Sequence, residues 1–98
     1  KMHLPNESVY NASKWAVTGF TGTLAMEARA YNVQVSNICP GGIATPFWQA
    51  QEFLPFPDKY DPERDFMKPE QVARVVVELA CTSPELVTSE IVLQPMLF

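Results

Sequence analysis

The feature that most constrains the fold is a pair of short apolar strand patterns separated by a helix pattern. Residues 33–39 alternate at first as a strand does, and residues 90–94 form a second strand pattern that Pro95 ends. Between them, residues 69–81 carry apolar side chains around most of a helix, which predicts a helix packed on more than one side. A strand–helix–strand order implies a right-handed parallel crossover, and parallel strands normally belong to larger sheets that are covered on both faces.

A longer helix pattern precedes the first strand. It runs from Val9 to Ala30 with apolar residues at four-residue spacing, and Asn32 is its expected stop. Gly19 and Gly22 each cost roughly 1 kcal/mol relative to Ala inside a helix, so they require a packing reason. The order helix–strand–loop–helix–strand predicts an α/β fold, the C-terminal end of a larger parallel sheet. Because two strands alone leave edges unpaired, residues 1–98 are expected to be the C-terminal part of one domain whose N-terminal half is absent from the chain.

Composition and charge argue against several classes of function. Seven Lys and Arg against eleven Asp and Glu give a net charge of −4, without the basic footprint of a nucleic-acid-binding protein. Charged residues interrupt every apolar run before the roughly 20 residues that span a bilayer. The opening segment KMHLPNESVY lacks the apolar core of a signal peptide, and two cysteines form neither a disulfide framework nor a metal-ligand spacing. A reduced, cytosolic protein without a metal or a membrane partner is expected.

Tyr10 and Lys14 stand four residues apart at the start of the long helix, so their side chains share one face. A tyrosine phenol ordinarily has a pKa of about 10, and a fixed ammonium beside a phenol favours the phenolate and lowers that pKa. The pair is therefore a rational acid/base combination. The spacing alone is weak evidence, because Tyr-x-x-x-Lys is more often a solvated lysine beside a half-buried tyrosine.

Four blocks of the sequence match the motifs of one known protein family. Residues 10–16, YNASKWA, resemble its Y-x-A-S-K-x-A signature, and a G-x-x-x-x-L-A-x-E helix pattern follows from Gly19. Residues 33–45 resemble the family's V-x-V-N-x-I-x-P-G-x-I/V-x-T strand and loop, and residues 69–73 resemble the P-E-x-V-A opening of its next helix. The blocks follow the order found in the short-chain dehydrogenase/reductase family, which this sequence resembles across nearly the whole chain.

The resemblance implies that the α/β fold is the C-terminal portion of a Rossmann-like doubly wound parallel sheet. It also implies an NAD(P)-dependent oxidoreductase that interconverts a carbonyl and an alcohol by hydride transfer. Tyr10 would be the catalytic acid/base, and Lys14 would bind the nicotinamide ribose and lower the pKa of the tyrosine, so both would also contact the cofactor. The loop after the strand would hold the nicotinamide end of NAD or NADP, with Ile43 offering its backbone to the carboxamide. The loop residues assigned to this role are Pro40, Gly41, Ile43 and Thr45. They lie beyond the carboxyl end of a strand, where ligands bind in open α/β sheets.

Residues 46–68 are irregular and rich in aromatic residues and proline, and would form the lid over a small-molecule carbonyl or alcohol substrate. A helical turn around residues 47–53 is expected there. Phe47 and Trp48 are the candidates for substrate contact, and packing inside the lid is an equal alternative. The family resemblance also implies a homodimer or homotetramer, packed through the small residues of the long helix.

The chain departs from the family pattern in several respects. It contains no G-x-x-x-G-x-G dinucleotide loop, it starts nine residues before Tyr10, short of the family's catalytic serine, and it lacks the helix with the family's asparagine. The 98-residue piece alone is therefore expected to be inactive. A catalytically inert remnant or interaction module of the same fold is the alternative, which saturable NAD(P)H binding would oppose, and a reductase domain of a larger multi-enzyme chain is a third possibility. NAD and NADP stay open, because the residues that read the ribose 2′ position would lie in the absent half.

Overall fold

The computed structural model describes residues 5–54 and 56–96. The first four residues of the opening segment and Pro55 of the expected lid lie outside the described residues. In chain order the elements are α1 (Ser8–Ala28), the 3-10 turn η1 (Arg29–Tyr31), β1 (Asn37–Pro40), the 3-10 turn η2 (Pro46–Ala50), α2 (Pro62–Asp65), α3 (Pro69–Ala80) and β2 (Glu90–Leu93). Contacts divide the described chain into two compact units. Unit 1 holds residues 5–39 and 82–91, and unit 2 holds residues 40–54, 56–81 and 92–96.

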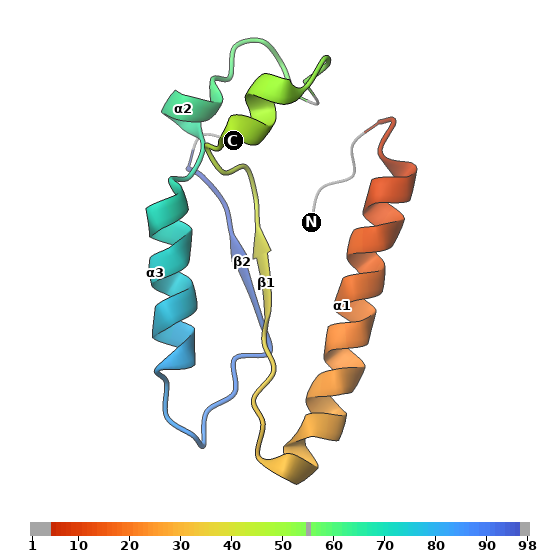
Figure 1. Ribbon diagram of the computed structural model, residues 1–98, viewed down its shortest axis with the longest axis vertical. Coiled ribbons are helices and arrows are strands. Elements are labelled where there is room, and N and C mark those ends of the chain that lie inside the picture. Colours follow the sequence, from red (N-terminus) through yellow and green to blue (C-terminus); the bar gives the residue numbers. More distant parts are fainter. Residues whose placement is uncertain (1–4, 55, 97–98) are drawn as a thin grey trace. The chain divides into compact units, whose positions relative to one another are not determined.

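β1 and β2 are neighbours in a two-stranded parallel sheet, and Figure 1 shows them side by side. The Asn37 amide donates to the Ser89 carbonyl at 3.0 Å, and the Gly41 amide donates to the Leu93 carbonyl at 2.7 Å. The pairing therefore advances in the same direction along both strands. Because α3 lies in the connection between them, the predicted α/β strand–helix–strand crossover is confirmed.

In unit 1, α1 is the long helix that the four-residue spacing predicts, and it is followed by the predicted stop at Asn32. Asn32 takes a left-handed φ of 56°, which asparagine adopts more readily than most residues. The Val33 amide then closes back on the Ala28 carbonyl at 3.2 Å. Gly19 and Gly22 have no heavy atom within 4 Å of the position of a Cβ, so the packing reason expected for them is not found within the described chain.

α1 leaves much of its apolar surface open. Large side chains that are more than half exposed are Val9, Tyr10, Val17, Phe20 and Met26, and Ala28 is the buried residue of the helix. The described chain includes no helix whose length and hydrophobicity would let it cross a bilayer.

β1 starts later than the predicted strand at residues 33–39. The structure gives Asn37–Pro40, because β2 supplies backbone partners only from Asn37 onward. Earlier in the segment, the Gln34 side-chain amide donates to three backbone carbonyls at 2.9–3.2 Å, those of Ser83, Pro84 and Leu86. This segment is therefore held by a side chain instead of a strand ladder. β2 matches its prediction to within one residue.

In unit 2, α3 begins with Pro69 at its first position and ends at Ala80, close to the predicted end at Cys81. The prediction that it packs on more than one side is not met within the described chain. One face, made of Val72, Val75 and Leu79, is partly covered, whereas Val76 and Val77 are 42% and 60% exposed. A two-stranded sheet offers a helix little surface, so the second face stays open.

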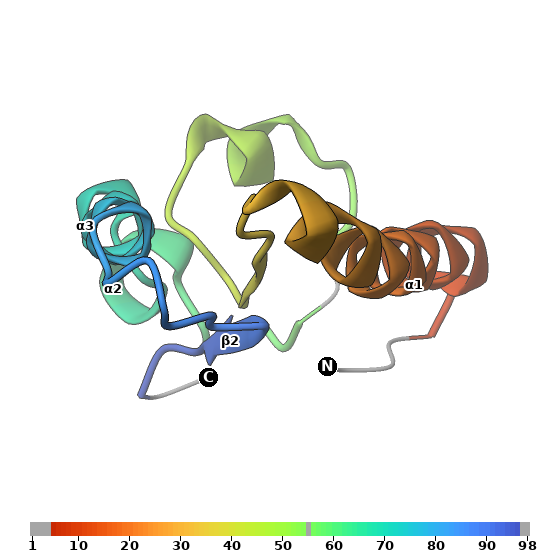
Figure 2. The same cartoon turned by 90° about the horizontal axis from the view of Figure 1, so that it is seen from below.

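Two short helical elements lie between β1 and α3. η2 at Pro46–Ala50 confirms the expected helical turn around residues 47–53. α2 was not predicted, although its start carries a recognisable signal: the Asp61 carboxylate accepts the Glu63 amide at 3.0 Å, and Pro62 takes the first helical position. Figures 1 and 2 show α2 and α3 following one another along one direction, with residues 66–68 between them.

Candidate active site

Tyr10 and Lys14 lie on consecutive turns near the start of α1. The Lys14 Nζ lies 5.4 Å from the centroid of the Tyr10 ring, within the range of a cation–π contact. Tyr10 is 56% exposed, Lys14 is also exposed, and within the described chain neither the phenol nor the ammonium has a hydrogen-bond partner. The two groups therefore share one face, as the spacing predicts, and a ligand can reach both.

Hydrogen bonds hold the backbone beneath this pair. The Ser13 hydroxyl donates to the Tyr10 carbonyl at 2.7 Å, and the Thr18 hydroxyl donates to the Lys14 carbonyl at 3.3 Å. Thr18 Oγ1 in turn accepts the side-chain amide of Asn37 at 3.2 Å. Unit 1 thus presents the phenol and the ammonium from a helix that is tied to the start of β1.

The segment that follows β1 is held in unit 2 by an isolated parallel bridge between Ile43 and Met67. The Ala44 amide donates to the Met67 carbonyl at 2.8 Å, and the Met67 amide donates to the Gly42 carbonyl at 3.0 Å. On the Ile43 residue itself, the carbonyl accepts the Trp48 Nε1–H at 2.7 Å. The Ile43 amide has no partner among the described residues, so it is available to donate to a ligand.

The two glycines of this loop have packing roles. A Cβ on Gly42 would lie 2.7–2.8 Å from three ring atoms of Phe66, and a Cβ on Gly41 would lie 3.3 Å from the Leu93 carbonyl oxygen. Neither glycine has a positive φ, so the requirement is one of space and not of backbone conformation. The close approach expected at Gly41 is made to β2, and the cofactor contact of Gly41 stays a prediction.

Phe47 and Trp48 have different surroundings. The half-buried Trp48 ring packs edge-on against Phe47, Phe56 and Phe66, at centroid distances of 5.0, 5.3 and 5.3 Å. Phe56 and Phe66 are buried and lie 5.1 Å from each other. This arrangement favours the packing alternative for Trp48. Phe47 is 58% exposed and keeps surface that a ligand could contact.

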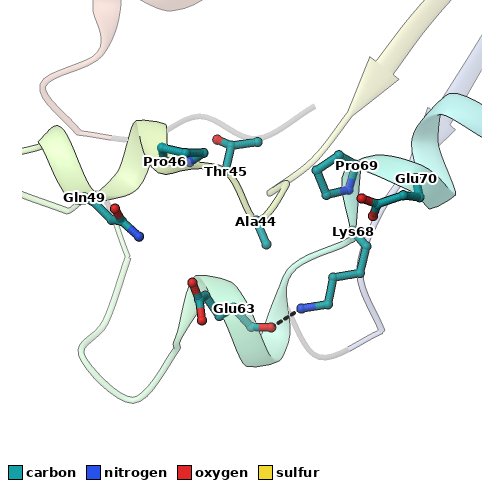
Figure 3. Close-up of a pocket in the computed structure, with 8 residues that line it drawn as sticks. All are labelled: Ala44, Thr45, Pro46, Gln49, Glu63, Lys68, Pro69 and Glu70. Atoms are coloured by element: carbon teal, nitrogen blue, oxygen red, sulfur yellow. Dashed lines mark hydrogen bonds between the residues drawn. The ribbon is translucent and has the colours of Figure 1, made fainter.

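Thr45 lines an open pocket of about 280 Å³ within unit 2 (Figure 3). The lining residues are Ala44, Thr45, Pro46, Gln49, Glu63, Lys68, Pro69 and Glu70. The Lys68 ammonium points across the pocket and donates to the Glu63 carbonyl. Of these residues, the sequence singled out Thr45. Glu63 and Lys68 were missed because α2 was not predicted, and the Asp61–Pro62 helix-start signal was the clue that could have placed them.

The predicted site residues fall into two groups. Unit 1 holds Tyr10 and Lys14, and unit 2 holds Pro40, Gly41, Ile43, Thr45, Phe47 and Trp48. Each group offers polar chemistry that fits a dinucleotide. Among the described residues, the Lys14 ammonium and the Tyr10 phenol have no hydrogen-bond partner and suit ribose hydroxyls, and the Ile43 amide has none and suits a carboxamide oxygen.

Comparison with known proteins bears on both groups. Residues 1–53 match a family model described as short chain dehydrogenase. The chain is 32% identical over 92 residues to a sepiapterin reductase of Chlorobaculum tepidum, an alignment that covers 92% of this chain and 34% of that protein. It is 36% identical over 93 residues to a 3-oxoacyl-[acyl-carrier-protein] reductase, FabG, of Thermotoga maritima, covering 90% of this chain and 37% of that protein.

A solved structure supports the fold independently. The crystal structure of a betaketoacyl-[ACP] reductase (FabG) from Bacteroides thetaiotaomicron matches with a TM-score of 0.74 at 21% sequence identity, covering 94% of this chain and 38% of that chain. This likeness shows a shared fold, a piece of a Rossmann-like sheet. The chain spans a little over a third of the length of the relatives named here.

Proposed function

This chain belongs to the short-chain dehydrogenase family, and on that premise we propose that the complete protein is an oxidoreductase that uses NAD or NADP to interconvert a carbonyl and an alcohol. The observation that carries the proposal is the exposed Tyr10–Lys14 pair on α1, which lies inside the matched residues 1–53. The relatives named as reductases support the same class of reaction.

We assign the proton transfer to Tyr10. In the direction of reduction its phenol donates a proton to the substrate's carbonyl oxygen, and in the reverse direction the phenolate accepts a proton from the alcohol. The Lys14 ammonium stabilises the phenolate by its charge and donates to the ribose hydroxyls, for which it has N–H groups free. A bound nicotinamide supplies the hydride in reduction and accepts it in oxidation. The exposure of both side chains supports these roles, since substrate and cofactor must reach them.

The loop after β1 is assigned to the nicotinamide end of the cofactor. The free Ile43 amide would donate to the carboxamide oxygen, and the Thr45 side chain, which lines a pocket, would contact the neighbouring part of the dinucleotide. Pro40 and Gly41 would shape the turn that brings this backbone to the ligand. The support for this assignment is the available amide of Ile43 and the family's P-G-x-I/V-x-T pattern at residues 40–45.

Residues 46–68 are proposed to cover a small-molecule substrate. Phe47 is the aromatic side chain of the predicted pair that keeps exposed surface for substrate contact. The relatives' names point to chemically different substrates, a sepiapterin and a 3-oxoacyl group on a carrier protein, so the proposal covers the carbonyl or alcohol function and no particular compound.

We further propose that residues 1–98 are the C-terminal part of a single dinucleotide-binding domain, since the chain spans a little over a third of its relatives. The exposed apolar side chains of α1 would then pack on the rest of that domain or on a second subunit, in a homodimer or homotetramer. A cytosolic location is part of the proposal, on the cysteine usage alone.

The test is a cofactor-oxidation assay on the complete protein. NADH and NADPH are offered separately with a panel of aldehydes, ketones and 3-oxoacyl thioesters, and loss of the reduced cofactor is followed by its ultraviolet absorbance. The proposal expects carbonyl-dependent oxidation of one cofactor, with the matching alcohol as product. NADH and NADPH are also titrated into the complete protein by calorimetry. If neither cofactor shows saturable binding, the proposal is rejected whatever substrate was chosen.

A further inference from the structure

Trp48 makes a hydrogen bond that its expected place in a substrate lid does not require. The indole Nε1–H donates to the Ile43 carbonyl at 2.7 Å, in a partly buried position. The bond joins η2, at the start of the lid segment, to the loop assigned to the nicotinamide. A short, partly buried hydrogen bond between these two segments restrains the peptide group between Ile43 and Ala44.

The Trp48 ring is itself restrained by other aromatic side chains. Phe56 and Phe66, which are 8% and 4% exposed, pack edge-on against it at 5.3 Å each. Phe66 also fills the space beside Gly42, where a Cβ would lie 2.7 Å from a ring atom. The indole therefore cannot leave Ile43 without disturbing a packed cluster that also touches the loop.

The bridge to Met67 fixes the opposite edge of the same segment. The peptide groups on either side of Ile43 bond to Met67, through the Gly42 carbonyl at 3.0 Å and the Ala44 amide at 2.8 Å. Because successive peptide groups alternate in direction along an extended segment, the amide and carbonyl of Ile43 lie on the edge away from Met67. On that edge the Trp48 indole N–H donates to the Ile43 carbonyl, and the Ile43 amide has no partner among the described residues.

We propose that Trp48 is a positioning residue for cofactor binding: its indole N–H holds the Ile43 carbonyl and so restrains the backbone torsions of Ile43, which keeps the Ile43 amide, in the preceding peptide group, directed at the nicotinamide carboxamide. The inference rests on the proposed function. The same indole packs among the aromatic side chains of the lid, so the Trp48–Ile43 hydrogen bond also couples the position of the lid to that of the cofactor loop. Loss of the indole N–H leaves the ring cluster in place, but the peptide group between Ile43 and Ala44 is then held by the Ala44 amide alone, which loosens the torsions of Ile43.

The test uses the complete protein with Trp48→Phe, which keeps an aromatic ring and removes the N–H donor. Dissociation constants are measured by calorimetry for the reduced dinucleotide and for the matching ADP-ribose compound, which has no nicotinamide. We expect the dinucleotide to bind about three- to tenfold more weakly, the effect of one hydrogen bond, with the ADP-ribose constant unchanged. Tyr31→Phe, at an aromatic residue that is 80% exposed and lies outside the lid and the cofactor loop, is the control and should leave the ratio of the two constants at the wild-type value.

An unchanged ratio of the two constants in Trp48→Phe would overturn the inference. Such a ratio arises when both compounds bind as they do to wild type, and also when both lose affinity equally, which is what a merely structural tryptophan would give. A wild-type protein that binds neither compound would instead reject the proposed function, so the two failures are distinct.

A second measurement covers the case in which Trp48→Phe fails to fold. In wild-type protein labelled with ¹⁵N, the Trp48 indole and Ile43 amide resonances should shift with the dinucleotide and not with the ADP-ribose compound. Shifts of equal size with both ligands would contradict the positioning role.

Discussion

The ammonium of Lys14 lies 5.4 Å from the centroid of the Tyr10 ring, one turn further along α1. Both side chains project from a helix whose backbone carbonyls at these positions also accept the Ser13 and Thr18 hydroxyls. A similar geometry occurs at Lys59 and Tyr60, where the distance is 5.1 Å. The distance alone therefore does not make a catalytic pair. What distinguishes Tyr10 and Lys14 is their place in the segment that matches the dehydrogenase family.

Lys14→Met in the complete protein is predicted to weaken NAD(P)H binding by about tenfold or more, because a charged donor to the ribose is lost. Turnover should fall further than binding, since the phenolate loses its neighbouring charge. Calorimetry and steady-state kinetics measure the two effects separately. Arg74→Met, which removes an exposed positive charge on α3, is the matched control. Wild-type cofactor affinity in Lys14→Met would contradict the ribose role.

Gly42→Ala is predicted to destabilise the protein by about 1–3 kcal/mol, the usual cost of overpacking. The new Cβ would lie 2.7–2.8 Å from three ring atoms of Phe66, which is 4% exposed and packed against other rings. Gly41→Ala is the graded comparison, since its Cβ would meet its nearest neighbour, the Leu93 carbonyl oxygen, at 3.3 Å. Urea denaturation should rank Gly42→Ala as the more damaging change. The reverse order would show that the Phe66 contact is not what excludes a side chain.

The Asp65 carboxylate is expected to make a pH-dependent contribution to the free energy of unfolding. Its carboxylate accepts Arg64 Nε at 2.8 Å, Arg64 Nη2 at 2.7 Å and the Asp61 amide at 2.8 Å. The Arg64 hydrogen bonds, and then the Asp61 amide, lower the pKa of Asp65 to about 2. A carboxyl whose pKa is lower in the folded state stabilises the fold above its ordinary pKa of about 4 and loses that contribution as the pH falls towards the folded value.

The corresponding measurement compares wild type with Asp65→Asn by urea denaturation from pH 7 down to about pH 2, the lower end of this titration. Asp65→Asn should be less stable at neutral pH, and the difference should shrink between about pH 4 and about pH 2. Asp58→Asn, at an exposed position in the same unit, controls for the change of net charge. A difference that stays constant over this range would contradict the assignment.

Local signals in the sequence predicted the helices well. The four-residue spacing and Asn32 placed α1 and its end, and Pro69 placed the start of α3. The start of β1 was predicted too early because the extent of a strand depends on its partner, and β2 pairs only from Asn37. α2 was missed even though its Asp61–Pro62 start is a local signal.

The candidate site was predictable only in part, because some of its contacts depend, as the start of β1 does, on a segment that is distant in the sequence. The shared face of Tyr10 and Lys14 follows from helix geometry alone. The Ile43–Met67 bridge and the Trp48–Ile43 hydrogen bond depend on how a loop without periodicity folds back on itself, and no spacing rule covers that. The sequence therefore offered equal alternatives for Trp48, and the ring contacts in the structure favour packing.

The measurement that tests the central claim most directly is turnover of the complete protein carrying Tyr10→Phe, with cofactor binding measured on the same sample. Tyr31→Phe, at a tyrosine that is 80% exposed in η1, is the matched control. The account predicts that Tyr10→Phe lowers turnover by at least about a hundredfold, the low end for a general acid–base group, while the cofactor still binds and Tyr31→Phe behaves as wild type. Near wild-type turnover in Tyr10→Phe would contradict it.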